Sequence, residues 1–589
     1  MGQRAQISYT GIAASPGIAI GEVRLLDRRR ISVQEYKIAP EQVDEEIRGF
    51  LEAVELTREQ LETVQRELVS QSKTEHFYII DTQLLILKDA MLIDSTVELI
   101  RTESINAAGA LKKVLRRFAA VFERIEDEYL RERGSDVELV GERIIRNING
   151  MELPQVGELE RRSVIVAHDL SPTDTCQFDV EHVVAFVTDL GGPTSHTAIL
   201  ARSMEIPAVV GLEKITRLVG DNTPVIVDGN SGVLICNPDK ETLKKYLELK
   251  RHYEFYKKQL RSYCDLPAVT ADGKNISMQA NIEFLQEADI AQNNGAQGIG
   301  LLRTEFMYMA RFQPPTEEEQ FLSYKKAAEL FAPYPVTIRT LDIGGDKFVS
   351  DISLEDEPNP AMGLRSIRMS LCEKRLFRIQ LRAILRASAY GDVRLMFPMI
   401  SGLAEVRAAK EIVTQVIQEL EDQGISVNRD IEVGIMVETP SAVFIADILA
   451  AEVDFFSIGT NDLIQYCLAV DRGNEHVAYL YEPFHPAILR ALKRIADAAH
   501  TAGIDLCICG EMAAEPMFSI VLIAMGYTQL SMSSQGISRV KKLIRQWDTR
   551  HSQELIAVLM EQKTAADVLR VLKDKLRQFL PESDPSLDY

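Results

Sequence analysis

The chain has 589 residues, 46% of them hydrophobic, and this length predicts three or four domains with sizeable cores. Its 66 basic residues stand against 87 acidic ones, and the resulting net charge of −21 disfavours nucleic acid as a partner and suits a basic protein partner. No apolar run reaches transmembrane length, no signal peptide opens the chain, and the seven scattered cysteines form no CxxC pair, so we expect a cytoplasmic protein without membrane insertion or a zinc site.

The N-terminal part of the chain alternates between strand and helix patterns. Residues 8–26 indicate short strands, and residues 33–148 indicate a helical bundle with apolar residues at helical spacing along 43–68. Strand patterns return after residue 151. We expect the early strands to join the later ones in one α/β domain, with the bundle inserted between them.

One turn in this domain carries a candidate nucleophile, in the stretch 191-GGPTSHTAILAR-202. The glycines and Pro193 end the preceding strand, and Thr194 or Ser195 can cap the helix that follows. His196 then lies in the first helical turn, where unpaired backbone N–H groups favour an anion and a neutral imidazole. The stretch therefore indicates a histidine that attacks phosphorus, and equally fits a surface histidine near a helix cap.

Residues 238–265 form a charged helical pattern with few residues suited to a core. This pattern predicts an exposed connector helix, which is compatible with a hinge between moving parts.

The C-terminal part repeats an alternation of strand and helix. Eight apolar strand patterns separated by helical stretches predict a (β/α)8 barrel. The strand patterns are 276–282, 297–305, 335–342, 393–400, 432–438, 455–462, 505–511 and 529–534.

Polar residues cluster at the C-terminal ends of these patterns, where barrel enzymes build their active sites. They are Asn281, Arg303, Glu305, Arg339, Asp342, Glu438, Asn461, Asp462, Cys509 and Glu511. Together with Arg365 and Arg472 in following loops, the arginines predict a site for a small anion that carries phosphate, although each arginine alone fits a surface ion pair.

Two carboxylates from different strand patterns, Glu438 and Asp462, are hard oxygen ligands suited to Mg²⁺ shared with a phosphate. Cys509 carries a thiol that stays mostly protonated at neutral pH and can donate a proton, although taken alone it fits a small buried core residue better. Cys507 should point to the same side if both residues lie in the strand.

These residues stand in stretches that together resemble enzyme I of the bacterial phosphotransferase system, the phosphoenolpyruvate-protein phosphotransferase family. The resemblance covers almost the whole chain. The stretches are GIAASPGIAIG at 11–21, GGPTSHTAILARSMEIPAVVG at 191–211, GIGLLRTEFMYM at 298–309, IRTLDIGGDK at 338–347, NPAMGLRSIR at 359–368, IMVETPSA at 435–442, SIGTNDLIQYCLAVDRGN at 457–474 and CGEMA at 509–513.

The resemblance implies a phosphotransferase that takes the phosphoryl group of phosphoenolpyruvate onto His196 and passes it to the histidine phosphocarrier HPr, the first step of sugar uptake by this system. It implies that Thr175 orients the His196 ring, that Cys509 protonates the enolate, and that Glu438 and Asp462 hold Mg²⁺. It further implies phosphoenolpyruvate contacts from Arg303, Arg339, Arg365, Asn461 and Arg472. Position 193 is Pro where many relatives carry Arg, which removes a cation beside His196.

The resemblance also implies the domain plan and the assembly. We expect a phosphohistidine α/β domain over 1–30 plus 151–237, an inserted HPr-binding helical bundle over 31–150 and a linker helix over 238–266. A phosphoenolpyruvate-binding TIM barrel over 267–578 follows, with a C-terminal tail over 579–589. The family's barrel domain forms a homodimer.

Two other functions fit parts of the sequence. A pyruvate phosphate dikinase or phosphoenolpyruvate synthase would share the histidine domain and the barrel, but would need a nucleotide-binding domain, and no Gly-rich phosphate loop precedes the histidine. A non-catalytic protein that binds phosphocarriers through the acidic bundle would not need the arginine and carboxylate set.

Overall fold

The computed structural model describes residues 6–26, 35–70, 83–84, 86–87, 90–122, 128–150, 162–170, 182–192, 195–204, 206–283, 285, 287–309, 314–343, 359–472, 474 and 476–580. These residues fall into two compact units, Met1–Lys257 and Lys258–Tyr589, and each is described by itself.

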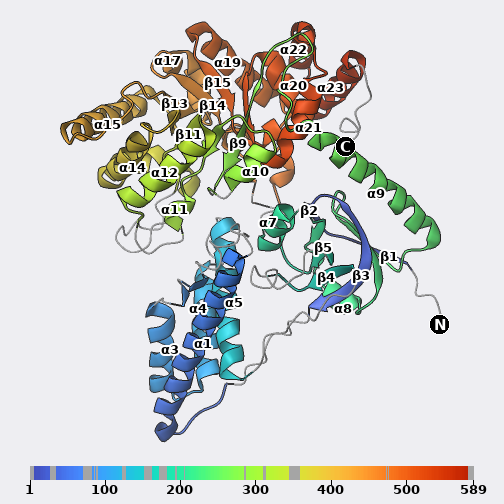
Figure 1. The fold of residues 1–589 in the computed structure, drawn as a ribbon, viewed down its shortest axis with the longest axis vertical. Coiled ribbons are helices and arrows are strands. Elements are labelled where there is room, and N and C mark those ends of the chain that lie inside the picture. Colours follow the sequence, from blue (N-terminus) through green and yellow to red (C-terminus); the bar gives the residue numbers. More distant parts are fainter. Residues whose placement is uncertain are drawn as a thin grey trace. The chain divides into compact units, whose positions relative to one another are not determined.

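The first unit contains a helical bundle, drawn in blue to cyan in Figure 1. Its helices are α1 (Val43–Ser70), α3 (Ala90–Glu103), α4 (Ala107–Phe122) and α5 (Glu128–Ile148). Apolar residues recur at helical spacing and face inward, so that Phe50, Leu61, Leu111 and Ile144 are fully buried in one core.

The other part of the first unit is an eight-stranded sheet with the order β1-β8-β7-β3-β4-β5-β6-β2. The strands are β1 (Ile7–Thr10), β2 (Ile12–Ser15), β3 (Ile18–Leu26), β4 (Ser163–Ala167), β5 (Val183–Thr188), β6 (Ala208–Val210), β7 (Pro224–Asp228) and β8 (Val233–Cys236). Val23 of β3 pairs with Val164 of β4, with the bundle between them in the sequence. The predicted joining of early and late strands is confirmed.

Among the described residues of this domain, two helices accompany the sheet, α7 (His196–Ser203) and α8 (Ile215–Leu218). Ala198 and Ala201 of α7 are fully buried and belong to a core with Phe186 of β5. This packing fixes the start of α7 close to the end of β5.

The connector is helix α9 (Lys240–Arg261), and none of its residues over 240–261 is buried. Near its start, Leu243 and Tyr246 pack partly against Ile18 and Ile226 of the sheet. Just after its end, the Cys264 carbonyl accepts a hydrogen bond of 2.7 Å from Lys541 Nζ, a side chain that is itself buried. The predicted exposed helix is confirmed, and each end of the segment is anchored.

The second unit is a closed barrel of eight parallel strands (Figure 1). They are β9 (Ser277–Ile282), β10 (Ile299–Leu302), β11 (Val336–Arg339), β12 (Val393–Phe397), β13 (Val433–Met436), β14 (Phe455–Ile458), β15 (Asp505–Ile508) and β16 (Gln529–Met532). All eight predicted strands form. The strand over 276–282 ends at Ile282 as predicted, and the other seven end earlier than the pattern indicated. Asn281 and Arg339 therefore lie in β9 and β11, and the other polar residues of the rim lie in the loops or helices that follow the strands.

Helices follow the strands and surround the barrel. They are α10 (Glu287–Asn293), α11 (Phe306–Met309), α12 (Glu317–Phe331), α13 (Ser366–Cys372), α14 (Lys374–Ala387), α15 (Leu403–Asp422), α16 (Pro440–Phe444), α17 (Ala446–Ala450), α18 (Thr460–Leu468), α19 (Pro486–Ala502), α20 (Pro516–Met525), α21 (Ser534–Ile544), α22 (Ser552–Met560) and α23 (Ala565–Phe579). Asn461 and Asp462 belong to the first turn of α18, which corrects the expected strand over 455–462.

Five residues on or next to barrel strands form a separate buried apolar cluster. They are Leu301, Met396, Met436, Phe455 and Cys509. In the part of the chain that the structure describes, no helix is both long and apolar enough to cross a membrane.

Candidate active site

The residues that follow β10 and β11 bring a guanidinium between two carboxylates. Arg339 Nη2 lies 2.8 Å from Glu305 Oε1, and Arg339 Nη1 lies 2.9 Å from Asp342 Oδ2. All three side chains are buried. Burial alone would raise the pKa of Asp342, but the nearby guanidinium groups of Arg339 and Arg365 more than offset it and lower this pKa below its ordinary value. Asp342 is therefore ionised and holds both arginines in place.

Arg365 joins this cluster from the start of α13. Its Nη2 donates to Asp342 Oδ1 over 3.1 Å, and its Nη1 donates to the Tyr466 hydroxyl over 3.2 Å. Ser366 has a φ of 55°, a backbone conformation that residues other than Gly rarely adopt. Its hydroxyl donates to the same Asp342 oxygen. The strained residue thus fixes the carboxylate that Arg365 contacts.

Two further arginines lie at the same end of the barrel. Arg303 pairs with Glu283, and burial raises the pKa of both Glu305 and Cys509, a rise that the nearby Arg303 charge only partly offsets. Arg472 Nη1 lies 4.0 Å from Glu511 Oε1, and the Asn461 amide donates to that same oxygen over 3.3 Å. Each of the four predicted arginines thus has a carboxylate partner.

Glu438 is fully buried beneath this mouth. Its Oε1 accepts the backbone N–H of Met399 over 2.6 Å, while Oε2 is buried without a hydrogen-bond partner among the described residues. Burial, reinforced by the negative charges of Asp462 and Asp342, raises the pKa of Glu438 to about 8. A buried carboxylate oxygen that lacks a proton donor and has a second carboxylate nearby is suited to a divalent cation.

The pair does not make a complete cage. Among the residues that the structure describes, no group of three or more His, Cys, Asp or Glu side chains converges on a metal position. Magnesium usually binds through one or two carboxylates and completes its coordination with water and substrate phosphate. Glu438 and Asp462 therefore fit Mg²⁺ that is shared with a phosphate.

Cys509 follows β15 and points into the barrel. The side chain is 3% exposed, and Sγ lies 3.6 Å from the carbonyl oxygen of Ile458. Burial raises the pKa of the thiol to about 11, so it carries a proton at neutral pH. Cys507 is buried as well, with Sγ 3.8 Å from Gln279 Oε1. Because β15 ends at Ile508, Cys509 lies beyond the strand, and the expectation for two residues within one strand does not apply.

The histidine stretch lies in the other unit. Helix α7 begins at His196, and Ser195 Oγ accepts the N–H of Ala198 over 3.3 Å, so Ser195 is the residue that caps the helix. Gly191 has a φ of 111°, which confirms the predicted glycine turn. The His196 side chain, Thr175 and Pro193 lie outside the described residues.

Sequence reasoning missed three side chains at the barrel mouth: Glu283, Ser366 and Tyr466. A Tyr466 hydroxyl facing Arg365 has no sequence signal, although its spacing of four residues from Asp462 places both on one side of α18. Asn281 and Glu305 were recognised at the rim, but their partners, Cys509 and Arg339, depend on how the strands align.

Three family models of known proteins match most of the chain. Residues 257–549 match the family model described as "PEP-utilising enzyme, PEP-binding domain", residues 10–133 match "PEP-utilising enzyme, N-terminal", and residues 159–232 match "PEP-utilising enzyme, mobile domain".

The chain is also similar to curated relatives over nearly its full length. It is 41% identical over 567 residues to the phosphoenolpyruvate-protein phosphotransferase of Haemophilus influenzae, covering 96% of this chain and 99% of that protein. It is 42% identical over 563 residues to the protein of the same name from a Bacillus species, strain S, covering 96% and 97%. A solution structure of an enzyme I protein shares 42% identity over 42% of this chain and 99% of its own, with a TM-score of 0.37.

Proposed function

This chain belongs to the phosphoenolpyruvate-protein phosphotransferase family, and on that premise we propose that it takes the phosphoryl group of phosphoenolpyruvate onto His196 and passes it to the histidine phosphocarrier HPr. It is a phosphotransferase of the sugar phosphotransferase system that uses phosphoenolpyruvate. The observation that carries the site assignment is the convergence of four arginines above a buried carboxylate, one oxygen of which has no hydrogen-bond partner among the described residues.

Arg339 and Arg365 are the primary phosphate ligands in this proposal. Their guanidinium groups are held by Asp342 and Glu305 before the substrate arrives, so binding an anion costs little side-chain entropy. Arg303, Arg472 and Asn461 surround the same mouth and contact the rest of the phosphoenolpyruvate anion.

Carboxylates outnumber arginines at this mouth, which makes it a poor site for a trianion without an added cation. We propose that Glu438 and Asp462 hold Mg²⁺ here. When bound, the ion neutralises charge on the phosphate and polarises its oxygens. The unpartnered Oε2 of Glu438 supports this assignment.

The transfer breaks the bond between phosphorus and the enol oxygen and forms a bond between phosphorus and a ring nitrogen of His196. The arginines stabilise the charge on the transferring group. The enolate that leaves takes a proton at carbon from the Cys509 thiol, which yields pyruvate. The protonated state of a thiol with a pKa of about 11 supports this role.

The phosphorylated His196 then presents its phosphoryl group to HPr. We propose the predicted domain plan as the framework: the bundle over 31–150 docks HPr, the linker over 238–266 lets the histidine domain move, and Thr175 orients the His196 ring. Exposed Leu51 and Leu56 on α1 offer apolar contact area within an acidic chain.

We further propose a cytoplasmic homodimer formed through the barrel. Phe444 at the end of α16 and Ile448 on the adjoining α17 are 68% and 48% exposed, an apolar pair that an interface would cover.

Label transfer tests the function directly. After incubation with labelled phosphoenolpyruvate and Mg²⁺, we expect acid-labile, alkali-stable label on His196 and release of pyruvate. His196→Ala should abolish the label, whereas His252→Ala, a change on the exposed connector helix, should not. Label on another residue, or no pyruvate, contradicts the proposal.

A further inference from the structure

We propose that Gln380 is a positioning residue for the phosphoryl-binding arginine Arg339, acting through Thr304; this inference rests on the proposed function. Gln380 lies on α14, outside the barrel wall, and is 1% exposed. The hydrogen bonds of its amide go to Leu341, Thr304 and Tyr324, none of which is assigned above to phosphoenolpyruvate or metal binding.

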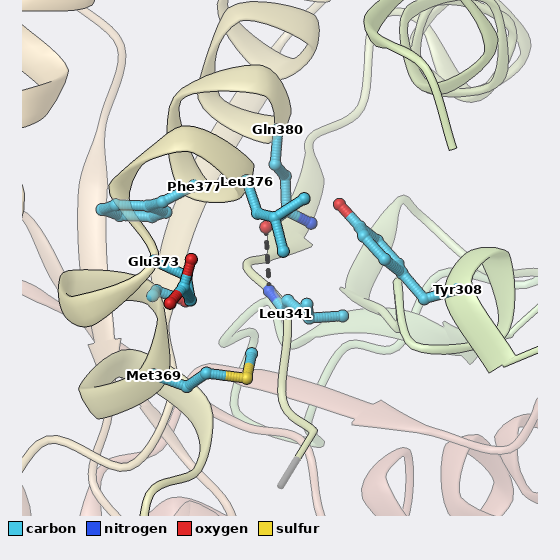
Figure 2. A pocket seen from close by; sticks show the side chains of 8 residues that line it. Tyr308, Leu341, Met369, Glu373, Leu376, Phe377 and Gln380 are labelled. Atoms are coloured by element: carbon cyan, nitrogen blue, oxygen red, sulfur yellow. Dashed lines mark hydrogen bonds between the residues drawn. The ribbon is translucent and has the colours of Figure 1, made fainter. Parts of the chain in front are cut away.

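The amide of Gln380 bridges the loops that follow two neighbouring strands. Its Oε1 accepts the backbone N–H of Leu341 over 2.9 Å, a bond shown as the dashed line in Figure 2. Its Nε2 donates to Thr304 Oγ1 over 3.1 Å, and that hydroxyl in turn donates to the Arg339 carbonyl over 3.0 Å. One side chain thus links the segment after β10 to the segment after β11.

The orientation of this amide is fixed by its partners. A backbone N–H can only donate, so the atom facing Leu341 is the amide oxygen, and the amide nitrogen must face Thr304. The Thr304 hydroxyl accepts from this nitrogen, which leaves its own hydrogen for the Arg339 carbonyl. The hydrogen bonds therefore run in one direction, from Gln380 Nε2 to Thr304 Oγ1 and from Thr304 Oγ1 to the Arg339 carbonyl.

A second buried glutamine closes the network on the outer side. Gln380 Nε2 also lies 3.5 Å from the Tyr324 hydroxyl, and Gln320 Oε1 accepts from the hydroxyls of both Tyr324 and Tyr308 at 3.2 Å. Gln320 Nε2 donates to the Pro315 carbonyl over 3.1 Å. Figure 2 shows Tyr308 and Gln380 beside the small pocket that this network borders. The network has little freedom to shift, because buried polar groups keep their partners.

The two bridged segments carry the central charges of the site. Thr304 lies between Arg303 and Glu305, and Leu341 lies between Arg339 and Asp342 in the second segment. The Gln380 bonds therefore set how far Glu305 stands from Arg339. A displacement of about 1 Å at a reacting group can slow a transfer about 100-fold, so a loosened bridge should reduce the rate.

The experiment measures single-turnover pyruvate release from phosphoenolpyruvate and Mg²⁺ by the full chain, together with the unligated melting temperature. The quantity compared is the single-turnover rate constant divided by the apparent dissociation constant of phosphoenolpyruvate. Gln380→Leu and Thr304→Val should each lower it about 10-fold or more, and Thr304→Ser should stay within about 2-fold of the parent. Because Gln380→Leu and Thr304→Val break the same chain of hydrogen bonds, the variant that combines them should be no slower than the slower of the two.

Gln279→Leu is the matched control. Gln279 is a glutamine of β9 in the same barrel, 2% exposed, and its amide donates to Ser277 and Gln529 instead. It should lower the melting temperature by a similar amount without the rate loss. If Gln380→Leu does not fold, the Thr304→Val and Thr304→Ser pair decides alone.

Parent-like rates in Gln380→Leu, additive losses in the double variant, or an equal rate loss in Gln279→Leu would overturn the proposal. A parent chain that releases no pyruvate would instead overturn the proposed function, so the two failures are distinguishable.

Discussion

Met399 donates its backbone N–H to Glu438 Oε1 over 2.6 Å, from a backbone conformation with a φ of 53°. This bond fixes the carboxylate so that its other oxygen stays buried and, among the described residues, without a hydrogen-bond partner. An oxygen left in this way is costly unless a cation completes it. The pairing therefore leaves Glu438 Oε2 available for the cation proposed above.

Glu438→Gln should weaken metal binding while preserving the shape of the side chain. The amide keeps an oxygen for the Met399 N–H but loses the negative charge, so Mn²⁺ or Mg²⁺ affinity should fall at least about 10-fold and turnover about 100-fold. Calorimetric titration of the metal into the full chain checks the affinity. Glu421→Gln, at a partly buried carboxylate of α15 that pairs with Arg429, should leave both values unchanged. Unchanged metal affinity in Glu438→Gln would contradict the assigned ligand.

Cys509→Ala should slow steady turnover and leave phosphoenolpyruvate binding nearly intact. The thiol acts on the enolate carbon after phosphorus has left, so its loss affects the rate more than the binding step. Pyruvate formation measured beside equilibrium binding of phosphoenolpyruvate separates the two effects. Equal losses of affinity and rate would instead indicate a packing role for this buried residue.

The buried thiols should make the barrel less stable at alkaline pH. Burial raises the pKa of Cys509 to about 11 and that of Cys507 further, whereas a cysteine in the unfolded chain has a pKa of about 8.5. Above that pH the unfolded chain binds fewer protons than the folded one, so the free energy of unfolding falls as pH rises. Urea unfolding at pH 7 to 10 measures the decline.

Alkylation gives a separate readout of the same thiols. The exposed Cys372 should react with iodoacetamide well before Cys507 or Cys509 at pH 8, as followed by mass spectrometry. Labelling of Cys509 at the speed of Cys372 would show that the thiol is neither buried nor protonated in solution.

Asp189→Asn should destabilise the eight-stranded sheet of the first unit, which α7 and His196 accompany. Asp189 is 3% exposed, accepts the N–H of Thr216 over 3.0 Å and pairs with His168 Nδ1 over 3.0 Å. Burial alone would raise its pKa, but these bonds more than offset it and hold the pKa below its ordinary value. The substitution should cost about 1–3 kcal/mol, because an amide replaces one acceptor oxygen.

The contribution of Asp189 has a defined pH window. A lowered folded pKa stabilises the native state above the unfolded value of about 3.9, and this stabilisation is lost as pH falls through the folded value. The hydrogen-exchange protection factors of the peptides around β5, which correct for the pH dependence of the intrinsic exchange rate, should therefore fall more steeply toward acid pH in the parent than in Asp189→Asn. Parallel pH profiles would contradict the role of the carboxylate.

Phe444→Asp should weaken the proposed barrel dimer. An exposed aromatic side chain is a typical anchor of an interface, and a charge there should raise the dissociation constant at least about 10-fold. Sedimentation equilibrium checks the value. Leu322→Asp, at a residue of α12 with 55% exposure, provides the control and should not change association. A monomeric parent chain would contradict the dimer itself.

Much of the barrel could be predicted because each parallel strand is buried on both faces and so forms a continuous apolar run. The position of Arg339 at the end of β11 follows from the same pattern. The end of β14 was harder to predict, because Thr460, Asn461 and Asp462 fit either a strand end or a first helical turn. In the structure Gly459 is the N-cap residue, so these three residues form the first turn of α18.

The pairing of Arg339 with Glu305 could not be predicted. It depends on the relative height of two strands, and the β10–β11 register shifts between Ile299 and Leu302. Likewise, Ser366 reaches Asp342 only because its backbone adopts a positive φ, and no sequence period encodes that conformation. Local patterns predict elements, whereas such contacts depend on distances across the fold.

The contacts at the two ends of α9 have a consequence for its length. Leu243 and Tyr246 pack its first turns against the sheet, and Lys541 donates a hydrogen bond to the Cys264 carbonyl just beyond its last turn. Between these points the helix is continuous, so removing one residue would rotate its C-terminal end by about 100° about the helix axis and shorten the helix by about 1.5 Å. Removing seven residues nearly restores the rotational phase and shortens the helix by about 10 Å. Helical phase and reach in α9 can thus be varied separately.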